Sequence, residues 1–197
     1  MLFRRLATLA LRLGRWTVQE DCVPPAPKSI LTAAPHTSFV DGFWMLVAMR
    51  HYGVKIRFLM NAKHLRGPFG LLKYVGAVPV TPGKGGTTAD LVKEAGTEEE
   101  FAIVISPPGT RSKQERWRSG FYHLAIETGL PIYFSYLDYG QRRVGIGTEP
   151  LIPSGDIVAD MDVVREFYGG MLGRAPEQTS TIVLREELEL GSAPDQA

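Results

Sequence analysis

The hydrophobic positions of this chain alternate between short apolar runs and longer stretches with helical spacing. Short apolar runs typical of buried strands occupy residues 29–34, 54–60, 77–81, 101–106, 132–136 and 144–147. Helical patterns or helix-start signals occupy residues 39–51, 67–74, the segment from 88 or 90 to about 96, 120–128 and 160–172. Because strands alternate with helices, we expect an α/β fold with a mixed, mostly parallel sheet flanked by helices.

The first 17 residues predict an amphipathic N-terminal helix. Its apolar side carries leucines and its other side arginines: Leu2, Leu6, Leu9 and Leu13, and Arg5, Arg12 and Arg15. A membrane span needs about 20 apolar residues, and the arginines interrupt such a run. We expect the helix to lie in the membrane interface, as in a peripheral membrane protein at the cytoplasmic face. Packing of this helix onto the folded domain is the alternative.

Length and composition bound the organisation of the chain. With 197 residues, of which 44% are hydrophobic and 22% charged, one globular domain is expected. We divide the chain into the helix and a proline-rich connector at 1–28, the α/β domain at 29–190 and a frayed tail at 191–197. The net charge of +1 gives no reason to expect a nucleic-acid partner. Cys22 is the only cysteine, which excludes an internal disulfide and fits a reducing compartment.

His36 and Asp41 stand between a predicted strand and a predicted helix. A histidine held by a carboxylate is a base that works near neutral pH. On one continuous helix the two side chains would point about 140° apart, so they meet only if His36 lies in the preceding turn. Pro35 favours that turn. The alternative is a capping box, in which Ser38 and Asp41 begin the helix; the two roles can coexist.

A second polar stretch, residues 109–118, follows the clearest buried strand of the sequence. This is the usual place for ligands in open α/β sheets. The stretch offers a glycine, two hydroxyls and four cations, which suit a phosphate: Gly109, Thr110, Ser112, Arg111, Lys113, Arg116 and Arg118. The alternative is a solvated basic loop without a ligand.

Taken together, these stretches match the motifs of a known family. His36 and Asp41 match the HxxxxD motif of the glycerolipid acyltransferases, best known for 1-acylglycerol-3-phosphate (lysophosphatidic acid) O-acyltransferases. Further blocks resemble that family in the same order, at residues 63–70, 76–80, 108–112 and 130–132. The resemblance covers residues 29–168, and four blocks in the right order make a chance match improbable.

The resemblance implies an acyltransferase that moves a fatty acyl group from acyl-CoA or acyl-carrier protein to a hydroxyl of a lysophospholipid. His36 would be the general base and Asp41 would orient it, while backbone N–H groups near Gly109 would stabilise the oxyanion. No cofactor is implied, because acyl-CoA or acyl-carrier protein is the acyl-donor substrate, and a membrane lipid is the partner. We assign substrate binding to Gly109, Thr110, Arg111, Ser112, Lys63, Lys84 and Arg116.

Two of the motifs depart from the family pattern. Pro108 stands where the third motif has a glutamate, and Thr81 and Pro82 stand where the second has an acid and an arginine. The family uses these positions for the glycerol-phosphate acceptor. Two alternatives therefore stay open: acylation of another lysolipid, such as a lyso-ornithine lipid, and a lipid-binding protein without turnover. No G-x-S-x-G elbow or metal-ligand cluster is present, so we expect neither a serine hydrolase nor a metal site.

Overall fold

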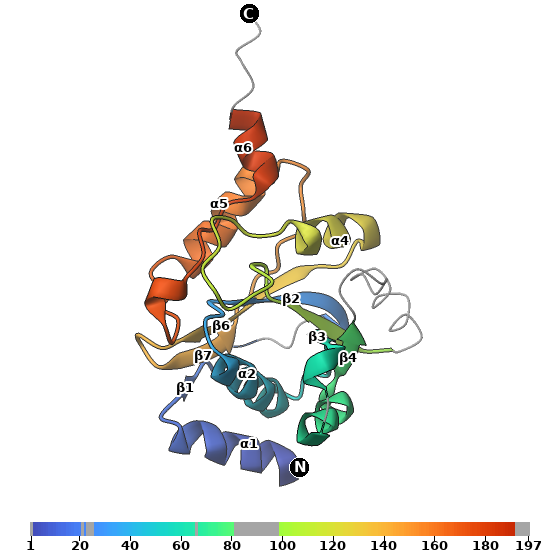
Figure 1. Cartoon of the computed structure of the whole chain (residues 1–197), viewed down its shortest axis with the longest axis vertical. Helices are drawn as coiled ribbons and strands as arrows, with labels where there is room; N and C mark the ends of the chain where they lie inside the picture. The colour runs from blue at the N-terminus through green and yellow to red at the C-terminus, as the bar shows by residue number, and fades with distance from the viewer. Residues whose placement is uncertain (1, 21, 23–25, 66, 81–98, 192–197) are drawn as a thin grey trace, which may run out of the picture.

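A seven-stranded sheet forms the centre of the molecule in the computed structural model, which describes residues 2–20, 22, 26–65, 67–80 and 99–191. Its strands are β1 (Thr17–Val18), β2 (Lys28–Ala34), β3 (Ile56–Asn61), β4 (Ala77–Val80), β5 (Phe101–Ile105), β6 (Ile132–Asp138) and β7 (Arg143–Ile146). The spatial order is β1-β7-β6-β2-β5-β3-β4, and among these neighbours β6 and β7 are antiparallel while the others are parallel (Figure 1). The predicted mixed, mostly parallel sheet is confirmed.

Helices cover both faces of this sheet. They are α1 (Leu2–Leu13), α2 (Phe39–Tyr52), α4 (Gly120–Thr128), α5 (Ile157–Tyr168), α6 (Arg185–Gly191) and the 3₁₀ helices η1 (Ala62–His64), η2 (Gly67–Val75) and η3 (Pro176–Gln178). One hydrophobic cluster joins the sheet to α4 and α5, and the other joins it to α1 and α2, below the sheet in Figure 1. The helix predicted from residue 88 or 90 lies outside the described residues, and the one predicted at 67–74 is a 3₁₀ helix.

Strand β2 runs through the middle of the core and leads to the first polar stretch. Ile30 and Ala34 face α4 and α5, whereas Leu31 faces α1 and α2. The Oγ1 atom of the fully buried Thr32 lies 2.8 Å from the hydroxyl oxygen of Tyr168, so a hydrogen bond also ties the strand to α5. The Ala34–Pro35 peptide bond that follows is cis. Residues 35–38 form a turn between β2 and α2, at the carboxyl edge of the sheet.

Helix α5 begins earlier and ends earlier than the predicted 160–172. Asp156 caps it, because its Oδ1 accepts hydrogen bonds of 3.1 Å from the backbone N–H groups of Val158 and Ala159. The helix ends at two glycines, of which Gly170 has a φ of +75°. Because Asp156 begins the helix and the two glycines end it, the observed bounds differ from the range that the apolar periodicity predicts.

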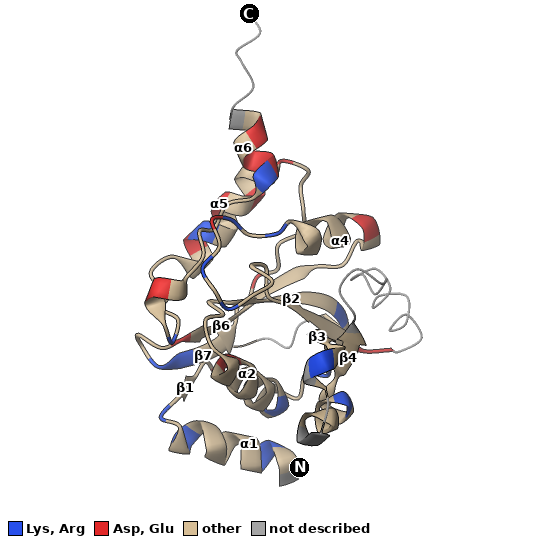
Figure 2. Ribbon diagram, viewed as in Figure 1, with Lys and Arg blue, Asp and Glu red and all other residues tan. Residues whose placement is uncertain are grey.

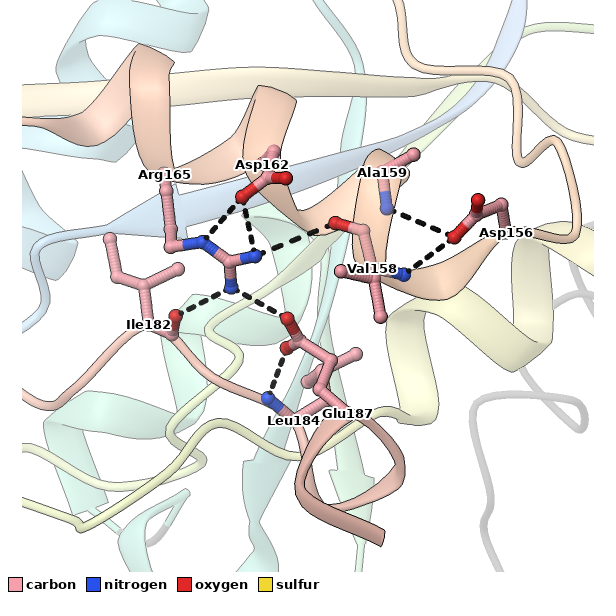
Figure 3. Close-up of polar contacts among 8 residues, drawn as sticks. All are labelled: Asp156, Val158, Ala159, Asp162, Arg165, Ile182, Leu184 and Glu187. Carbon is pink, nitrogen blue, oxygen red and sulfur yellow. Dashed lines mark hydrogen bonds and ion pairs between the residues drawn. The ribbon is translucent and has the colours of Figure 1, made fainter. Parts of the chain in front are cut away.

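Helix α6 was not predicted, and polar contacts hold it against α5 (Figure 3). The Arg165 guanidinium donates to Asp162 at 2.8 Å, to Glu187 at 2.7 Å and to the Ile182 carbonyl at 3.2 Å. Glu187 also accepts a 2.6 Å hydrogen bond from the N–H of the buried Leu184. The acidic sequence of α6 lacks an apolar stripe, so these contacts, absent from any local pattern, fix its place. The predicted tail begins at the last residue of α6, and residues 192–197 lie outside the described part.

Helix α1 packs on α2 and keeps a second apolar face in solvent. Ala7 and Leu11 are buried, and Thr8 Oγ1 lies 2.8 Å from Nδ1 of His51 on α2. The helix thus packs on the domain, which was the alternative to a purely interfacial position. Four large apolar side chains of this helix are exposed: Phe3 by 65%, Leu6 by 51%, Leu9 by 52% and Leu13 by 77%.

Candidate active site

The turn between β2 and α2 brings His36 and Asp41 together. Ser38 caps α2 and forms a capping box with Asp41, whose Oδ2 accepts hydrogen bonds from the N–H groups of Thr37 at 2.7 Å and Ser38 at 2.8 Å. The same Oδ2 lies 3.5 Å from Nδ1 of His36. Both predicted roles therefore coexist: the capping box fixes the carboxylate, and the carboxylate faces the imidazole.

Tyr139, which sequence reasoning missed, completes the environment of Asp41. Its hydroxyl donates a 2.8 Å hydrogen bond to Oδ1 of Asp41, and its ring packs edge-on against Trp16 with centroids 4.9 Å apart. Burial alone would raise the pKa of the Asp41 carboxyl, but hydrogen bonds from His36, Tyr139, Thr37 and Ser38 outweigh burial and hold that pKa below its usual value. Asp41 is therefore a buried carboxylate that stays ionised.

This arrangement gives the imidazole a defined chemical capability. The Asp41 side chain is 3% exposed and the His36 side chain 23%, so the acid is enclosed while the base reaches the surface of the site. A carboxylate facing Nδ1 favours the tautomer with a proton on that nitrogen, which leaves Nε2 able to accept a proton. An oriented base of this kind can remove a proton from a hydroxyl that approaches it.

The loop at residues 109–118 reaches the same site. The Arg111 guanidinium lies 3.4 Å from the centroid of the Phe39 ring, at the first turn of α2. Pro108 and His36 line one small cavity of about 30 Å³. Gly109 has a φ of +70°, and a Cβ there would lie 3.1 Å from Nε of Arg118. The conformation of this turn and the close approach of Arg118 both favour glycine at this position.

The predicted binding residues do not all gather here. Thr110 and Ser112 belong to the same turn, where the Ser112 N–H donates to Thr110 Oγ1 at 3.4 Å. Lys63 lines the larger cavity described below, whereas Arg116 is exposed and lines neither cavity. Lys84, like Thr81 and Pro82, lies outside the described residues.

A larger apolar cavity of about 690 Å³ opens at the His36–Asp41 pair. Its walls come chiefly from α2, β3 and η2, with further residues from β2, β5, β6, η1 and the turns that follow β2 and β5. The apolar lining includes Phe39, Phe43, Met45, Leu46, Ile56, Phe58, Met60, Phe69 and Leu72. Such a volume is typical of a pocket for a small molecule, about 300–1,000 Å³. No local pattern in the sequence indicates the cavity, because its walls come from separate elements.

A segment after α5 also approaches the turn. The Ala175 N–H donates a 3.1 Å hydrogen bond to Thr37 Oγ1, and a Cβ at Gly173 would lie 2.7 Å from the same atom. Arg174, between them, acts electrostatically on the Tyr139 hydroxyl, whose pKa is raised chiefly by burial and by Asp41. Sequence reasoning did not connect Arg174 to the site.

Within the described part of the chain, no group of three or more His, Cys, Asp or Glu side chains could hold a metal ion. No described helix has the length and apolarity needed to cross a membrane.

Comparison with known proteins places the chain in a family. The family described as Acyltransferase matches residues 15–135, more than half of the chain and including both polar stretches. This chain belongs to the Acyltransferase family. The resemblance to glycerolipid acyltransferases, expected from the motifs, is confirmed at the level of the family. No curated protein matches the sequence significantly.

The fold of this acyltransferase is also similar to a solved structure. It is the 1-acyl-sn-glycerophosphate (LPA) acyltransferase PlsC from Thermotoga maritima, with a TM-score of 0.57 and 16% sequence identity. The match covers 84% of this chain and 76% of that chain. At this identity the comparison supports the fold alone.

Proposed function

We propose that this acyltransferase transfers a fatty acyl group from an acyl thioester to a hydroxyl of a lysophospholipid such as 1-acylglycerol-3-phosphate. The observation that carries the proposal is the apolar cavity of about 690 Å³ that has His36 and Asp41 in its wall. Each methylene group buried in such a cavity contributes about 0.8 kcal/mol, so it suits an aliphatic chain. Family membership supports the reaction class, and acyl-CoA and acyl-carrier protein are both candidate donors.

In this proposal His36 acts as the general base. Its Nε2 takes the proton of the acceptor hydroxyl as the hydroxyl oxygen attacks the thioester carbonyl. Asp41, 3.5 Å from Nδ1, orients the ring and stabilises its protonated form. Assistance of this kind contributes on the order of 10²–10⁴ in rate. No covalent acyl-enzyme is required.

The acceptor phosphate is proposed to bind at the loop that carries Arg111. The Arg111 guanidinium stacks on Phe39 at the cavity wall, which places a cation beside the apolar lining. Gly109, Thr110 and Ser112 complete the turn, and Lys63 contributes a second cation from the cavity lining. Lys84 and Arg116 remain proposals from the sequence. A lyso-ornithine lipid or a related lysolipid is the second candidate acceptor, because Pro108 removes the carboxylate that the family places in this turn.

Membrane binding is proposed to use α1 and η2. Exposed apolar side chains lie on both, including Leu13 at 77% and Tyr74 at 88% exposure. Lysines and arginines colour this end of the molecule in Figure 2, whereas acidic residues are frequent at α6 at the opposite end. Because η2 also supplies Phe69 and Leu72 to the cavity, a lysolipid could pass from the bilayer surface to the cavity. The cytoplasmic face, where acyl carriers reside, is the proposed side.

The transferase proposal is tested with acyl-CoA or acyl-carrier protein, a panel of lysolipids, and release of the free thiol as the readout. His36→Ala is expected to lower kcat by about 10²–10⁴-fold. His123→Ala is the matched control, since His123 is 58% exposed and pairs with Glu186. Turnover that survives His36→Ala would contradict the assigned base. Absence of turnover for the wild-type protein over the whole panel would favour a lipid-binding protein.

The acceptor site is tested by charge reversal. Arg111→Glu is expected to raise the KM of a phosphate-bearing acceptor at least about tenfold, since it replaces attraction by repulsion. Lys55→Glu serves as control, because Lys55 is 68% exposed and lines neither cavity. An unchanged KM for Arg111→Glu would remove this loop from the acceptor site.

Membrane binding is tested without disturbing the core. Replacing Leu6, Leu9 and Leu13 by serine changes exposed side chains of α1, so the fold should persist. Sedimentation with vesicles of anionic phospholipid is expected to fall, because the buried apolar area and the electrostatic attraction act together at the interface. Full sedimentation of the triple variant would show that α1 is not the anchor.

A further inference from the structure

A polar side chain that the proposed mechanism leaves unused lines the large cavity. Ser106 follows the last residue of β5, and its Oγ is buried without a hydrogen-bond partner among the described residues. Side chains alternate along a strand, so Ser106 shares the face of Ala102 and Val104, toward α2. Ser106, Val104 and Ala33 line the cavity together. Ser106 therefore borders a predominantly apolar space, with its hydroxyl oxygen enclosed in the cavity wall.

The strand register places Ser106 at the reactive end of the cavity. Strands β2 and β5 are parallel, with Thr32 opposite Ile105. Continuing that register by one residue sets Ser106 beside Ala33, at the edge from which the chain turns to His36. The carboxyl ends of parallel strands meet at one edge, where ligands bind in open α/β sheets. Ser106 thus lies at the same edge as the proposed base.

Several backbone donors near the site are already engaged. The N–H groups of Thr37 and Ser38 donate to Asp41. Residues 107 and 108 are prolines and have no N–H, while the Gly109 N–H donates to the Ser106 carbonyl at 2.9 Å. The Gly109 amide, one of the N–H groups in the region from which oxyanion stabilisation was expected, is therefore committed to its own turn. The Ser106 hydroxyl is an uncommitted donor in this cavity wall.

We propose that the Ser106 hydroxyl donates a hydrogen bond to the carbonyl oxygen of the acyl thioester and stabilises the oxyanion that forms there. A buried hydroxyl without a partner costs about 1–3 kcal/mol, which a bound carbonyl oxygen would offset. A saturated acyl chain offers no other hydrogen-bond acceptor to this cavity. The inference rests on the proposed acyl transfer and deepens it by naming the donor of the oxyanion site.

Acyl transfer to a hydroxyl acceptor proceeds in two steps. The acceptor oxygen bonds to the thioester carbon as its proton passes to Nε2 of His36, and the carbonyl oxygen becomes an anion held by the Ser106 O–H. The tetrahedral intermediate then collapses: the carbonyl re-forms, the carbon–sulfur bond breaks, and the proton on His36 passes to the departing thiolate. The products are an ester and a free thiol, and both side chains return to their starting states.

The test compares Ser106→Ala with Ser29→Ala. Ser29 is fully buried in β2 and its Oγ also lacks a partner, so both substitutions remove an unsatisfied hydroxyl. Neither is expected to lower the free energy of unfolding measured in urea. With acyl-CoA and a lysophospholipid, Ser106→Ala is expected to lower kcat by about 10²–10³-fold with little change in KM, whereas Ser29→Ala keeps wild-type kcat.

Three outcomes would overturn the inference. The first is a Ser106→Ala kcat equal to that of Ser29→Ala. The second is a loss confined to KM, and the third is a loss confined to donors whose acyl chain carries a hydroxyl group, which would assign Ser106 to chain selection. If Ser106→Ala does not fold, Ser106→Cys decides, because its weaker S–H donor should lower kcat and full activity would overturn the inference.

Failure of the inference is distinguishable from failure of the proposed function. If the wild-type protein releases no thiol with any donor and acceptor, acyl transfer itself is refuted. If the wild-type protein turns over and Ser106→Ala does so equally well, the reaction stands and Ser106 has no part in it.

Discussion

Replacing Tyr139 by phenylalanine removes one of three short hydrogen bonds to the Asp41 carboxylate and leaves the aromatic ring in place. The lost bond is the 2.8 Å contact to Oδ1, while the 2.7 and 2.8 Å contacts from two backbone amides to Oδ2 remain. A hydrogen bond to a charged group contributes about 1.5–3 kcal/mol. We expect Tyr139→Phe to lower the free energy of unfolding by about that amount at neutral pH.

The pH dependence of that loss has a definite sign. The pKa of Asp41 is held below its ordinary value of 3.8, because its hydrogen bonds, including that from Tyr139, outweigh burial. Its ionised form therefore contributes stability that is present above about pH 3.8 and is lost as the pH falls through the lowered pKa. Tyr139→Phe moves this pKa upward. The stability difference between wild type and variant should be full near neutrality and shrink in acid.

Urea unfolding at a series of pH values measures the loss of unfolding free energy and its dependence on pH. Tyr122→Phe is the matched control. The Tyr122 hydroxyl donates a 2.7 Å hydrogen bond to Asp160, remote from the site. Both variants should lose stability, but only Tyr139→Phe should also slow thiol release, by about tenfold, because it loosens the carboxylate that orients His36. A Tyr139→Phe protein within about 0.5 kcal/mol of wild type at every pH would refute the reasoning.

Three further perturbations test the fold around the site. Leu11→Ala should cost about 2–5 kcal/mol of unfolding free energy in urea, because Leu11 is fully buried between α1 and the sheet. Gly109→Ala should destabilise by about 1–2 kcal/mol and reduce turnover, because φ is +70° there. The pKa of His51 is lowered by burial and by Arg4 and Arg12, so the folded protein binds protons less readily and loses stability as the pH falls below about 6.5. His51→Gln should flatten that part of the stability profile.

Each of these expectations has a contradicting result. Leu11→Ala with wild-type stability would mean that α1 does not pack as described. Gly109→Ala with unchanged stability and turnover would show that the turn relaxes without strain. Equal pH profiles of unfolding free energy for His51→Gln and wild type between about pH 7 and pH 5 would show that the pKa of His51 is not lowered by folding.

Local signals in the sequence predicted most of the described elements. The apolar run before Pro35 predicted β2, and the Ser38 cap with an apolar helical pattern predicted α2. Such signals succeed because side-chain periodicity and capping depend on residues a few positions apart. Where no local signal existed, prediction failed: β1 has two residues, and α6 depends on the Arg165–Glu187 ion pair across 22 positions.

The sequence alone determined the α/β architecture, the family motifs and the neighbourhood of His36 and Asp41, because each is encoded within one short segment or in the order of segments. The tertiary structure decided that Tyr139, 98 positions away, donates to Asp41, that α1 packs on α2, and that an apolar cavity ends near an unpaired Ser106 hydroxyl. Those facts follow from strand order and parallel register, which bring the ends of distant strands to one edge. No local pattern in the sequence encodes the proximity of these strand ends, since it depends on the packing of the whole core.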